Sequence, residues 1–158
     1  MIQFLPLQLS DKPIIDSLLA RADAPICDCT FANIYMWQPT YHTSWAEVGG
    51  LLVVSYRIGL SWGYMVVGEG DWALAYDELN DYVTGRGEAL RLVSMSSRGV
   101  AEFRKWLDSR GLDEGNFAIF NSRDYQDYIY SVEELCTLPG RCFQPKRNHL
   151  NRFASQYE

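Results

Sequence analysis

The sequence is short of positive charge. Its 158 residues carry 14 lysines and arginines against 20 aspartates and glutamates, which gives a net charge of −6 and a pI near 4.9. Binding to duplex DNA depends on many basic side chains that contact phosphates, so this balance argues against a duplex DNA partner. Any site for an anion must therefore be local and built from a few residues.

The chain also lacks a long hydrophobic run. No apolar stretch approaches the roughly 18 to 20 residues that cross a bilayer. The first six residues, MIQFLP, lack the basic and apolar regions of a signal peptide. We therefore expect a cytoplasmic protein that is not membrane-spanning.

Cysteine and histidine are scarce, with four and two residues. The cysteines are too few and too unevenly spaced for a disulfide scaffold, so we expect reduced thiols. One residue separates Cys27 from Cys29, instead of the two that let both thiolates reach one zinc ion, and we expect no metal. Neither His42 nor His149 lies in a recognised pattern with a nucleophile, which disfavours a hydrolase.

What is present is the composition of one globular domain. The chain is 47% hydrophobic and 22% charged, and domains commonly span about 100 to 200 residues. It contains no internal repeat, no low-complexity tract and no linker rich in proline, glycine or serine. We predict a single domain over residues 1–158.

Hydrophobic periodicity predicts alternating strands and helices. Strands are expected at 4–7, 43–48, 51–58, 60–67, 90–95 and 116–120. Helices are expected at 10–22, 71–82, 97–110, 131–138 and 145–157. A further short helix is expected from Asp28 or Thr30 to Trp37, with a stop near Pro39. Glycine turns join the second, third and fourth strands closely, so these strands should form an antiparallel meander.

The last helix carries a dense group of basic and amide side chains. Pro145 suits the first turn of a helix, because its missing N–H has no intrahelical partner to lose. Lys146, Arg147 and Asn148 follow it, where the helix dipole disfavours a cation by about 0.3 to 1 kcal/mol. A bound phosphate or carboxylate would reverse that penalty. This pattern predicts an anion site. The equally weighted alternative is a solvated basic turn that pairs with Asp124, Asp127, Glu133 and Glu134.

The same segment has an apolar stripe. Phe143, Leu150, Phe153 and Tyr157 recur at intervals of seven, three and four residues, which is typical of one helix face. We expect the helix to dock by this stripe.

A weaker phosphate-loop candidate is the glycine turn after the fourth strand. Gly68 and Gly70 could expose main-chain amides to a pyrophosphate. Glu69 and Asp71 place carboxylates where a phosphate would enter. The favoured interpretation is therefore a tight turn in which Asp71 caps the next helix.

A tyrosine-rich segment could take part in proton transfer. Tyr125, Tyr128 and Tyr130 lie next to Asp124 and Asp127, and a phenol beside a carboxylate can donate and accept hydrogen bonds. The more common origin of such a pattern is a half-buried strand, which we favour here.

Three motifs carry a family resemblance. They are FANIYMW at 31–37 with Tyr41, DYQDYIY at 124–130 followed by LCTLPG at 135–140, and KRNHLNRF at 146–153. Together they resemble the phosphatidylglycerol lysyltransferase C-terminal domain family, over most of the chain. The resemblance implies the acyl-CoA N-acyltransferase (GNAT) fold: an α+β domain whose mixed, mainly antiparallel central sheet has helices on both faces. The predicted order of elements agrees with it.

The resemblance also implies an activity. An acyl or aminoacyl group would move from a phosphate-bearing donor, aminoacyl-tRNA or acyl-coenzyme A, to an amine or hydroxyl acceptor. The partner would be a phosphate-bearing small molecule or the acceptor end of a tRNA. By motif, the donor phosphates would be held by Lys146, Arg147, Asn148 and Asn151. The acceptor would lie near the catalytic candidates Asp124, Tyr125 and Tyr128.

Two departures keep other functions open. Members of the family commonly have two tandem GNAT-like halves, and this chain resembles the first, so a second half or a homodimer would complete the site. The turn at 68–70 also lacks the glycine-rich pattern that holds coenzyme A pyrophosphate in ordinary GNAT enzymes. The alternatives are a catalytically silent ligand-binding or dimerisation module and an ordinary GNAT N-acetyltransferase.

Overall fold

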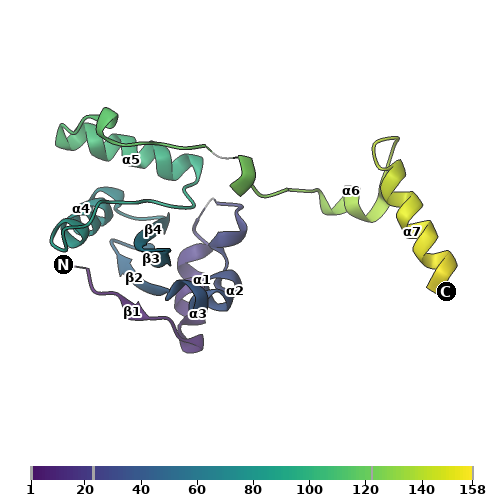
Figure 1. The fold of residues 1–158 in the computed structure, drawn as a ribbon, viewed down its shortest axis with the longest axis horizontal. Helices are drawn as coiled ribbons and strands as arrows, with labels where there is room; N and C mark the ends of the chain where they lie inside the picture. Colours follow the sequence, from purple (N-terminus) through teal and green to yellow (C-terminus); the bar gives the residue numbers. More distant parts are fainter. Residues whose placement is uncertain (1, 23, 122, 158) are drawn as a thin grey trace. The chain divides into compact units, whose positions relative to one another are not determined.

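The computed structural model describes residues 2–22, 24–121 and 123–157 (Figure 1). The chain divides into two compact units, Met1–Phe120 (unit 1) and Asn121–Glu158 (unit 2). Unit 1 contains, in order, β1 (Leu5–Pro6), η1 (Leu9–Asp11), α1 (Lys12–Leu19), η2 (Cys27–Cys29), α2 (Phe31–Met36), α3 (Gln38–Tyr41), β2 (Ser44–Val48), β3 (Leu51–Ile58), β4 (Ser61–Gly68), α4 (Trp72–Thr84), α5 (Ser97–Arg110) and η3 (Glu114–Asn116). Unit 2 contains η4 (Arg123–Tyr125), α6 (Val132–Thr137) and α7 (Gln144–Tyr157).

The sheet of unit 1 has four antiparallel strands in the order β1-β2-β3-β4, and β2, β3 and β4 form a meander. Val48 pairs with Leu51 across the first tight turn, and Ile58 pairs with Ser61 across the second. The first turn is made by two glycines with φ values of 59° and 85°, a region that glycine enters without steric cost. The predicted meander is confirmed.

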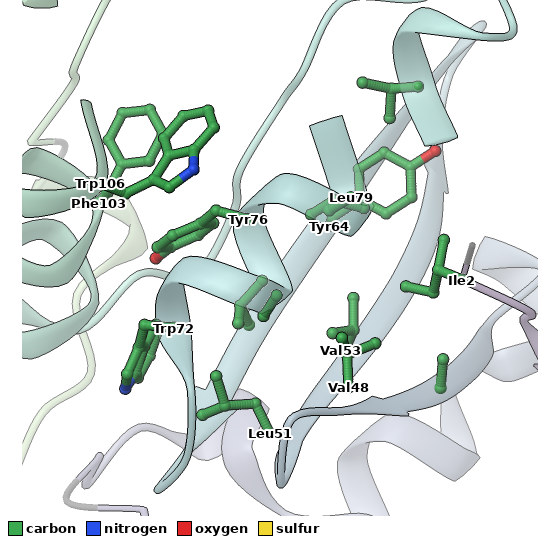
Figure 2. Close-up of a cluster of buried hydrophobic side chains, with 14 of the residues drawn as sticks. Ile2, Val48, Leu51, Val53, Tyr64, Trp72, Tyr76, Leu79, Phe103 and Trp106 are labelled. Atoms are coloured by element: carbon green, nitrogen blue, oxygen red, sulfur yellow. The ribbon is translucent and has the colours of Figure 1, made fainter. Parts of the chain in front are cut away.

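Each face of the sheet carries its own apolar core, because successive residues of a strand point to opposite sides. Val53 and Val66 face α4 and α5, whereas Val54 and Met65 face α1 and α2. On the first face, the ring centroid of Tyr76 of α4 lies 5.5 Å from Phe103 and 5.6 Å from Trp106 of α5 (Figure 2). The α+β class with helices on both faces is confirmed.

Side-chain caps define where several helices begin. Thr30, Asp71, Ser96 and Ser131 each accept a hydrogen bond from the main-chain N–H three residues later. These bonds satisfy N–H groups that have no partner inside the helix. The predicted bounds of α5 are confirmed to the residue, and Gly111 ends it with a φ of 64°.

Two predictions about secondary structure are wrong. The expected strand at 90–95 is only a parallel bridge between Leu92 and Tyr64, because Ser94 turns away with a φ of 51°. The expected strand at 116–120 has no strand partner among the described residues; Phe117 packs on Phe103, and Phe120 is 87% exposed. The second helix is found as α2, which ends at Met36 before Pro39. A short helix that was not predicted, α3, follows it with Pro39 in its first turn, where a proline is tolerated.

No helix in the described part of the chain is both long enough and apolar enough to cross a bilayer.

Candidate functional site

The predicted basic helix exists, and it begins one residue earlier than expected, at Gln144. Its first-turn amides are largely used within the chain. The Gln144 N–H donates to the Arg141 carbonyl at 3.2 Å, the Arg147 N–H donates to the Phe143 carbonyl at 3.0 Å, and Pro145 has no N–H. An anion at this end would therefore be bound mainly by side chains.

The guanidinium of Arg147 is held by the turn between α6 and α7. Its Nη1 donates to the main-chain carbonyls of Leu138 and Gly140, the latter at 2.8 Å, and Nη2 donates to Gln144 Oε1 at 2.6 Å. Three of its five N–H donors are thus assigned. The remaining two, on Nε and Nη2, have no partner among the described residues. The result is a fixed cation that retains donors for a ligand.

The geometry of α7 separates the four predicted donor-binding residues. An α-helix turns about 100° per residue, so Arg147, Asn148 and Asn151 share one face with Gln144. Gln144 Nε2 donates to Asn148 Oδ1 at 3.0 Å on that face. Lys146 lies on the opposite face. We call the face that carries Arg147, Asn148 and Asn151 the polar face of α7.

The opposite face of α7 is apolar and exposed. By the same geometry, Lys146 shares this face with Leu150, Phe153 and Tyr157. The exposed fractions of those three side chains are 59%, 61% and 74%. We call these three residues the apolar stripe of α7.

Lys146 contacts the tyrosine-rich segment through a cation–π interaction. Its Nζ lies 5.7 Å from the ring centroid of Tyr130, and that ring stacks on Tyr128 with centroids 6.4 Å apart. Asp124 is exposed in η4, and the side chain of Tyr125 lies outside the described part of the structure. The expected half-buried strand is wrong, because residues 126–130 form no strand and Tyr128 is 83% exposed.

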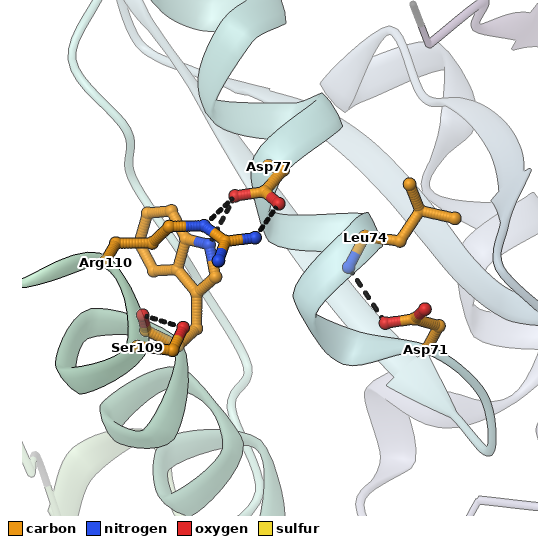
Figure 3. Close-up of polar contacts among 6 residues, drawn as sticks. Asp71, Leu74, Asp77, Ser109 and Arg110 are labelled. Carbon is orange, nitrogen blue, oxygen red and sulfur yellow. Dashed lines mark hydrogen bonds and ion pairs between the residues drawn. The ribbon is translucent and has the colours of Figure 1, made fainter.

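The glycine turn after β4 is packed tightly against the β2–β3 turn. A Cβ on Gly70 would lie 2.2 Å from the Gly49 carbonyl oxygen, and the Asp71 N–H donates to that oxygen at 2.8 Å. Gly68 has a φ of 121°, which favours glycine. Asp71 caps α4 by accepting from the Leu74 N–H at 3.0 Å (Figure 3). Packing and capping therefore account for both glycines and for Asp71.

Two hollows lie elsewhere in unit 1. A cavity of about 10 Å³, the size of one water molecule, lies beside the buried Trp72, whose indole N–H has no hydrogen-bond partner among the described residues. A surface hollow of about 540 Å³ lies beside Thr43. It is lined by Phe4, Pro6, Gln38, Pro39, His42, Thr43 and Ser44. None of the predicted catalytic or donor-binding residues lines either hollow, although Gly68 borders the small cavity.

Unit 1 also holds a polar cluster that sequence reasoning missed. The half-buried carboxylate of Asp28 in η2 accepts a hydrogen bond from Ser94 Oγ at 2.5 Å and one from Asn33 Nδ2 at 3.1 Å. Burial is the main cause that raises the pKa of the Tyr56 phenol. The negative charge of Asp28 raises this pKa further, and Cys29 adds a smaller contribution. We call Asp28, Asn33, Tyr56 and Ser94 the Asp28 cluster.

A family model described as "Phosphatidylglycerol lysyltransferase, C-terminal" matches residues 20–158. The chain belongs to this family. The match spans both sets of residues that the sequence nominated, the tyrosine segment and the basic helix. It also spans the Asp28 cluster.

A solved structure extends the comparison. The chain is similar to a conserved protein of unknown function from Bacteroides thetaiotaomicron VPI-5482, with 32% sequence identity and a TM-score of 0.88. The similarity covers 99% of this chain and 51% of that one, so this family member spans about half the length of the solved relative. No curated protein matches the chain.

One sequence signal could have pointed to the Asp28 cluster, the motif at 31–37 that carries the family resemblance. Asn33 lies within the 31–37 motif, and its side chain bonds to Asp28. Ser94 is 66 positions from Asp28 and stands in no recognised motif. Only the folded chain brings the two together.

Proposed function

We propose that this protein is an acyl- or aminoacyl-transferase domain that takes its group from a phosphate-bearing donor, aminoacyl-tRNA or acyl-coenzyme A. The acceptor is an amine or a hydroxyl. The observation that carries the proposal is family membership over residues 20–158, because the family is named for a lysyltransferase and the match includes all of the described part of α7. A tRNA donor would also place the reaction in the cytoplasm.

The polar face of α7 is the proposed binding site for the phosphates of the donor. Arg147 offers two N–H donors from a guanidinium that three hydrogen bonds already orient. A fixed guanidinium loses little conformational entropy when an anion binds, and charge-assisted bonds to phosphate are strong. Asn148 and Asn151 add amide donors on the same face. Lys146, on the opposite face, would approach a second phosphate beside Tyr130.

The catalytic candidates keep the roles that the family resemblance gave them. Asp124, Tyr125 and Tyr128 would orient the acceptor and manage its proton, because a carboxylate and a phenol can exchange hydrogen bonds with an amine or hydroxyl. The attack would be direct, so catalysis would come from positioning the acceptor against the activated carbonyl.

We further propose that residues 1–158 make up one GNAT-like domain, equivalent to the first of two halves. The solved relative supports a two-half arrangement, since this chain covers 51% of it. A second half, or a second copy of this chain, would then complete the acceptor side.

The test is transfer from a charged donor. The full chain would be incubated with lysyl-tRNA carrying labelled lysine and vesicles containing phosphatidylglycerol, and in parallel with labelled acetyl-coenzyme A and an amine. Label in the lipid supports the lysyltransferase form. Label only in the acetylated amine supports an ordinary N-acetyltransferase. No transfer in either, combined with no binding of either donor, contradicts the proposal.

A second candidate function is assembly without catalysis. The apolar stripe of α7 favours it, because three large side chains on one helix face are more than half exposed. Two copies of the chain could bury these stripes against each other in a symmetric dimer.

A further inference from the structure

We infer that the Asp28 cluster is a binding site for a primary ammonium group. The inference rests on the proposed function and deepens it, since an aminoacyl group and an amine acceptor both carry such a group. It concerns unit 1, and none of its residues is among those that the sequence nominated.

The cluster joins three separate parts of unit 1. Asp28 comes from η2, Asn33 from α2, and Ser94 from the segment that follows the parallel bridge to β4. Asp28 Oδ2 accepts from Ser94, and Oδ1 accepts from Asn33 at 3.1 Å and from the Cys27 thiol at 3.8 Å. The carboxylate is therefore fixed in position from two sides by neutral donors.

Backbone strain holds one of these donors in place. Ser94 has a φ of 51°, a region that costs a non-glycine residue of order 1 kcal/mol and persists only where its surroundings impose it. Its hydroxyl lies 2.5 Å from the Asp28 carboxylate. Strained residues cluster at functional sites, and the strain here serves to place a hydroxyl on a carboxylate.

The charge of Asp28 is not neutralised within the chain. Among the described residues, Asp28 has no ion pair, although it is half-buried. A half-buried carboxylate that accepts hydrogen bonds only from neutral donors is stabilised when a cation binds next to it, because Coulomb attraction strengthens as the local dielectric falls.

The side chains around Asp28 favour an organic cation over a metal ion. No group of three or more histidine, cysteine, aspartate or glutamate side chains that could hold a metal occurs among the described residues. The Tyr56 hydroxyl has no hydrogen-bond partner in the described part of the chain, and its ring lies against Tyr41 with centroids 6.3 Å apart. An ammonium group offers three N–H donors, which can be shared among a carboxylate, a phenol oxygen and the Ser94 oxygen. Aromatic rings add cation–π attraction.

A direct binding measurement tests the site without any donor substrate. The full chain, labelled with ¹⁵N, would be titrated with n-butylammonium, and n-butanol would serve as the neutral control. We expect saturable shifts of the Asn33 side-chain amide and the Ser94 main-chain amide with n-butylammonium alone. Asp28→Asn should weaken binding at least tenfold. The matched control Asp108→Asn, which removes an exposed carboxylate on α5, should leave it unchanged.

A second variant keeps the test decisive if Asp28→Asn does not fold. Ser94→Gly suits the positive φ and removes one of the three oxygens proposed to accept from the ammonium group, so binding should weaken more than threefold. Absence of saturable shifts in the wild type, equal affinity in Asp28→Asn, or unchanged affinity in Ser94→Gly would overturn the inference. Because no donor is present, a chain that binds ammonium but neither transfers a group nor binds either donor contradicts the proposed function alone. A chain that transfers but shows no such binding contradicts only this inference.

Discussion

Arg110, the last residue of α5, forms an ion pair with Asp77 of α4 (Figure 3). Its Nε donates to Asp77 Oδ1 at 2.9 Å, and the Trp106 indole N–H donates to the same oxygen at 2.8 Å. One carboxylate thus ties two turns of α5 to α4 at the edge of the apolar core.

The Asp77 carboxylate should make the stability of unit 1 depend on pH. The hydrogen bond from Arg110, and then the one from Trp106, hold the pKa of Asp77 below its ordinary value. A carboxyl whose pKa is lowered by folding stabilises the protein above its unfolded pKa, near 4. That contribution is lost as the pH falls through the lowered folded pKa. Asp77→Asn should therefore lower Tm at pH 7 by about 3 to 6 °C.

Thermal melts of both proteins between pH 7 and pH 2.5 check this prediction. The difference in Tm should be constant above about pH 5 and should shrink below about pH 4. Asp81→Asn, on the same helix, is the control and should melt like the wild type. A difference between wild type and Asp77→Asn that is the same at every pH would contradict the role assigned to the ionised carboxylate.

Gly70 should tolerate no side chain. A Cβ there would lie 2.2 Å from the Gly49 carbonyl oxygen, which belongs to a tight turn and cannot move away alone. Gly70→Ala should cost about 2 to 3 kcal/mol in the free energy of unfolding, as overpacking does. Gly99→Ala is the matched control: within α5 its Cβ would meet only ordinary contacts of 3.7 to 3.9 Å, so it should be neutral or slightly stabilising. Urea denaturation compares the two, and equal destabilisation would refute this account of the turn.

Arg147 should order the turn between α6 and α7. Arg147→Ala removes the hydrogen bonds to the Leu138 and Gly140 carbonyls and to Gln144. Because the side chain is only half-buried, we expect local opening to become easier by about 1 to 2 kcal/mol. Hydrogen exchange of the amides at 138–144 should then quicken about 5- to 30-fold. Arg152→Ala should leave their exchange unchanged, and unchanged exchange in Arg147→Ala would show that these bonds do not order the turn.

The apolar stripe of α7 should govern self-association. If two copies bury it, the wild type should run as a dimer in light scattering coupled to size exclusion. The double substitution Leu150→Asn and Phe153→Asn should then give a monomer that remains folded by circular dichroism. A monomeric wild type at high micromolar concentration would remove assembly by this stripe as a function.

The sequence predicts unit 1 well wherever a local rule decides the structure. The glycines at 49 and 50 impose the tight turn, and Asp71 and Ser96 cap helices that begin where their spacing indicates. The strand expected at 90–95 fails because only Leu92 bridges to β4 before Ser94 turns. No local pattern shows how far a strand pairing extends.

The candidate site residues are likewise predicted from the sequence where a local rule applies and missed where only the fold brings residues together. Helical spacing places Arg147, Asn148 and Asn151 on one face of α7 without any tertiary information. It does not reveal that the Arg147 guanidinium reaches back to Leu138 and Gly140. Nor does it reveal the contact between Asp28 and Ser94, because their separation of 66 residues is closed only by the fold of unit 1.

The central claim is that the polar face of α7 holds the phosphates of a donor. It is tested most directly by fluorescence anisotropy with a labelled minihelix of the tRNA acceptor stem, with coenzyme A as the second probe. The account predicts saturable binding of at least one probe by the wild type. The double variant Asn148→Ala and Asn151→Ala should bind it at least tenfold more weakly, and Lys105→Ala on α5 should bind it normally. Binding of neither probe, or equal binding by the wild type and the double variant, would contradict the claim.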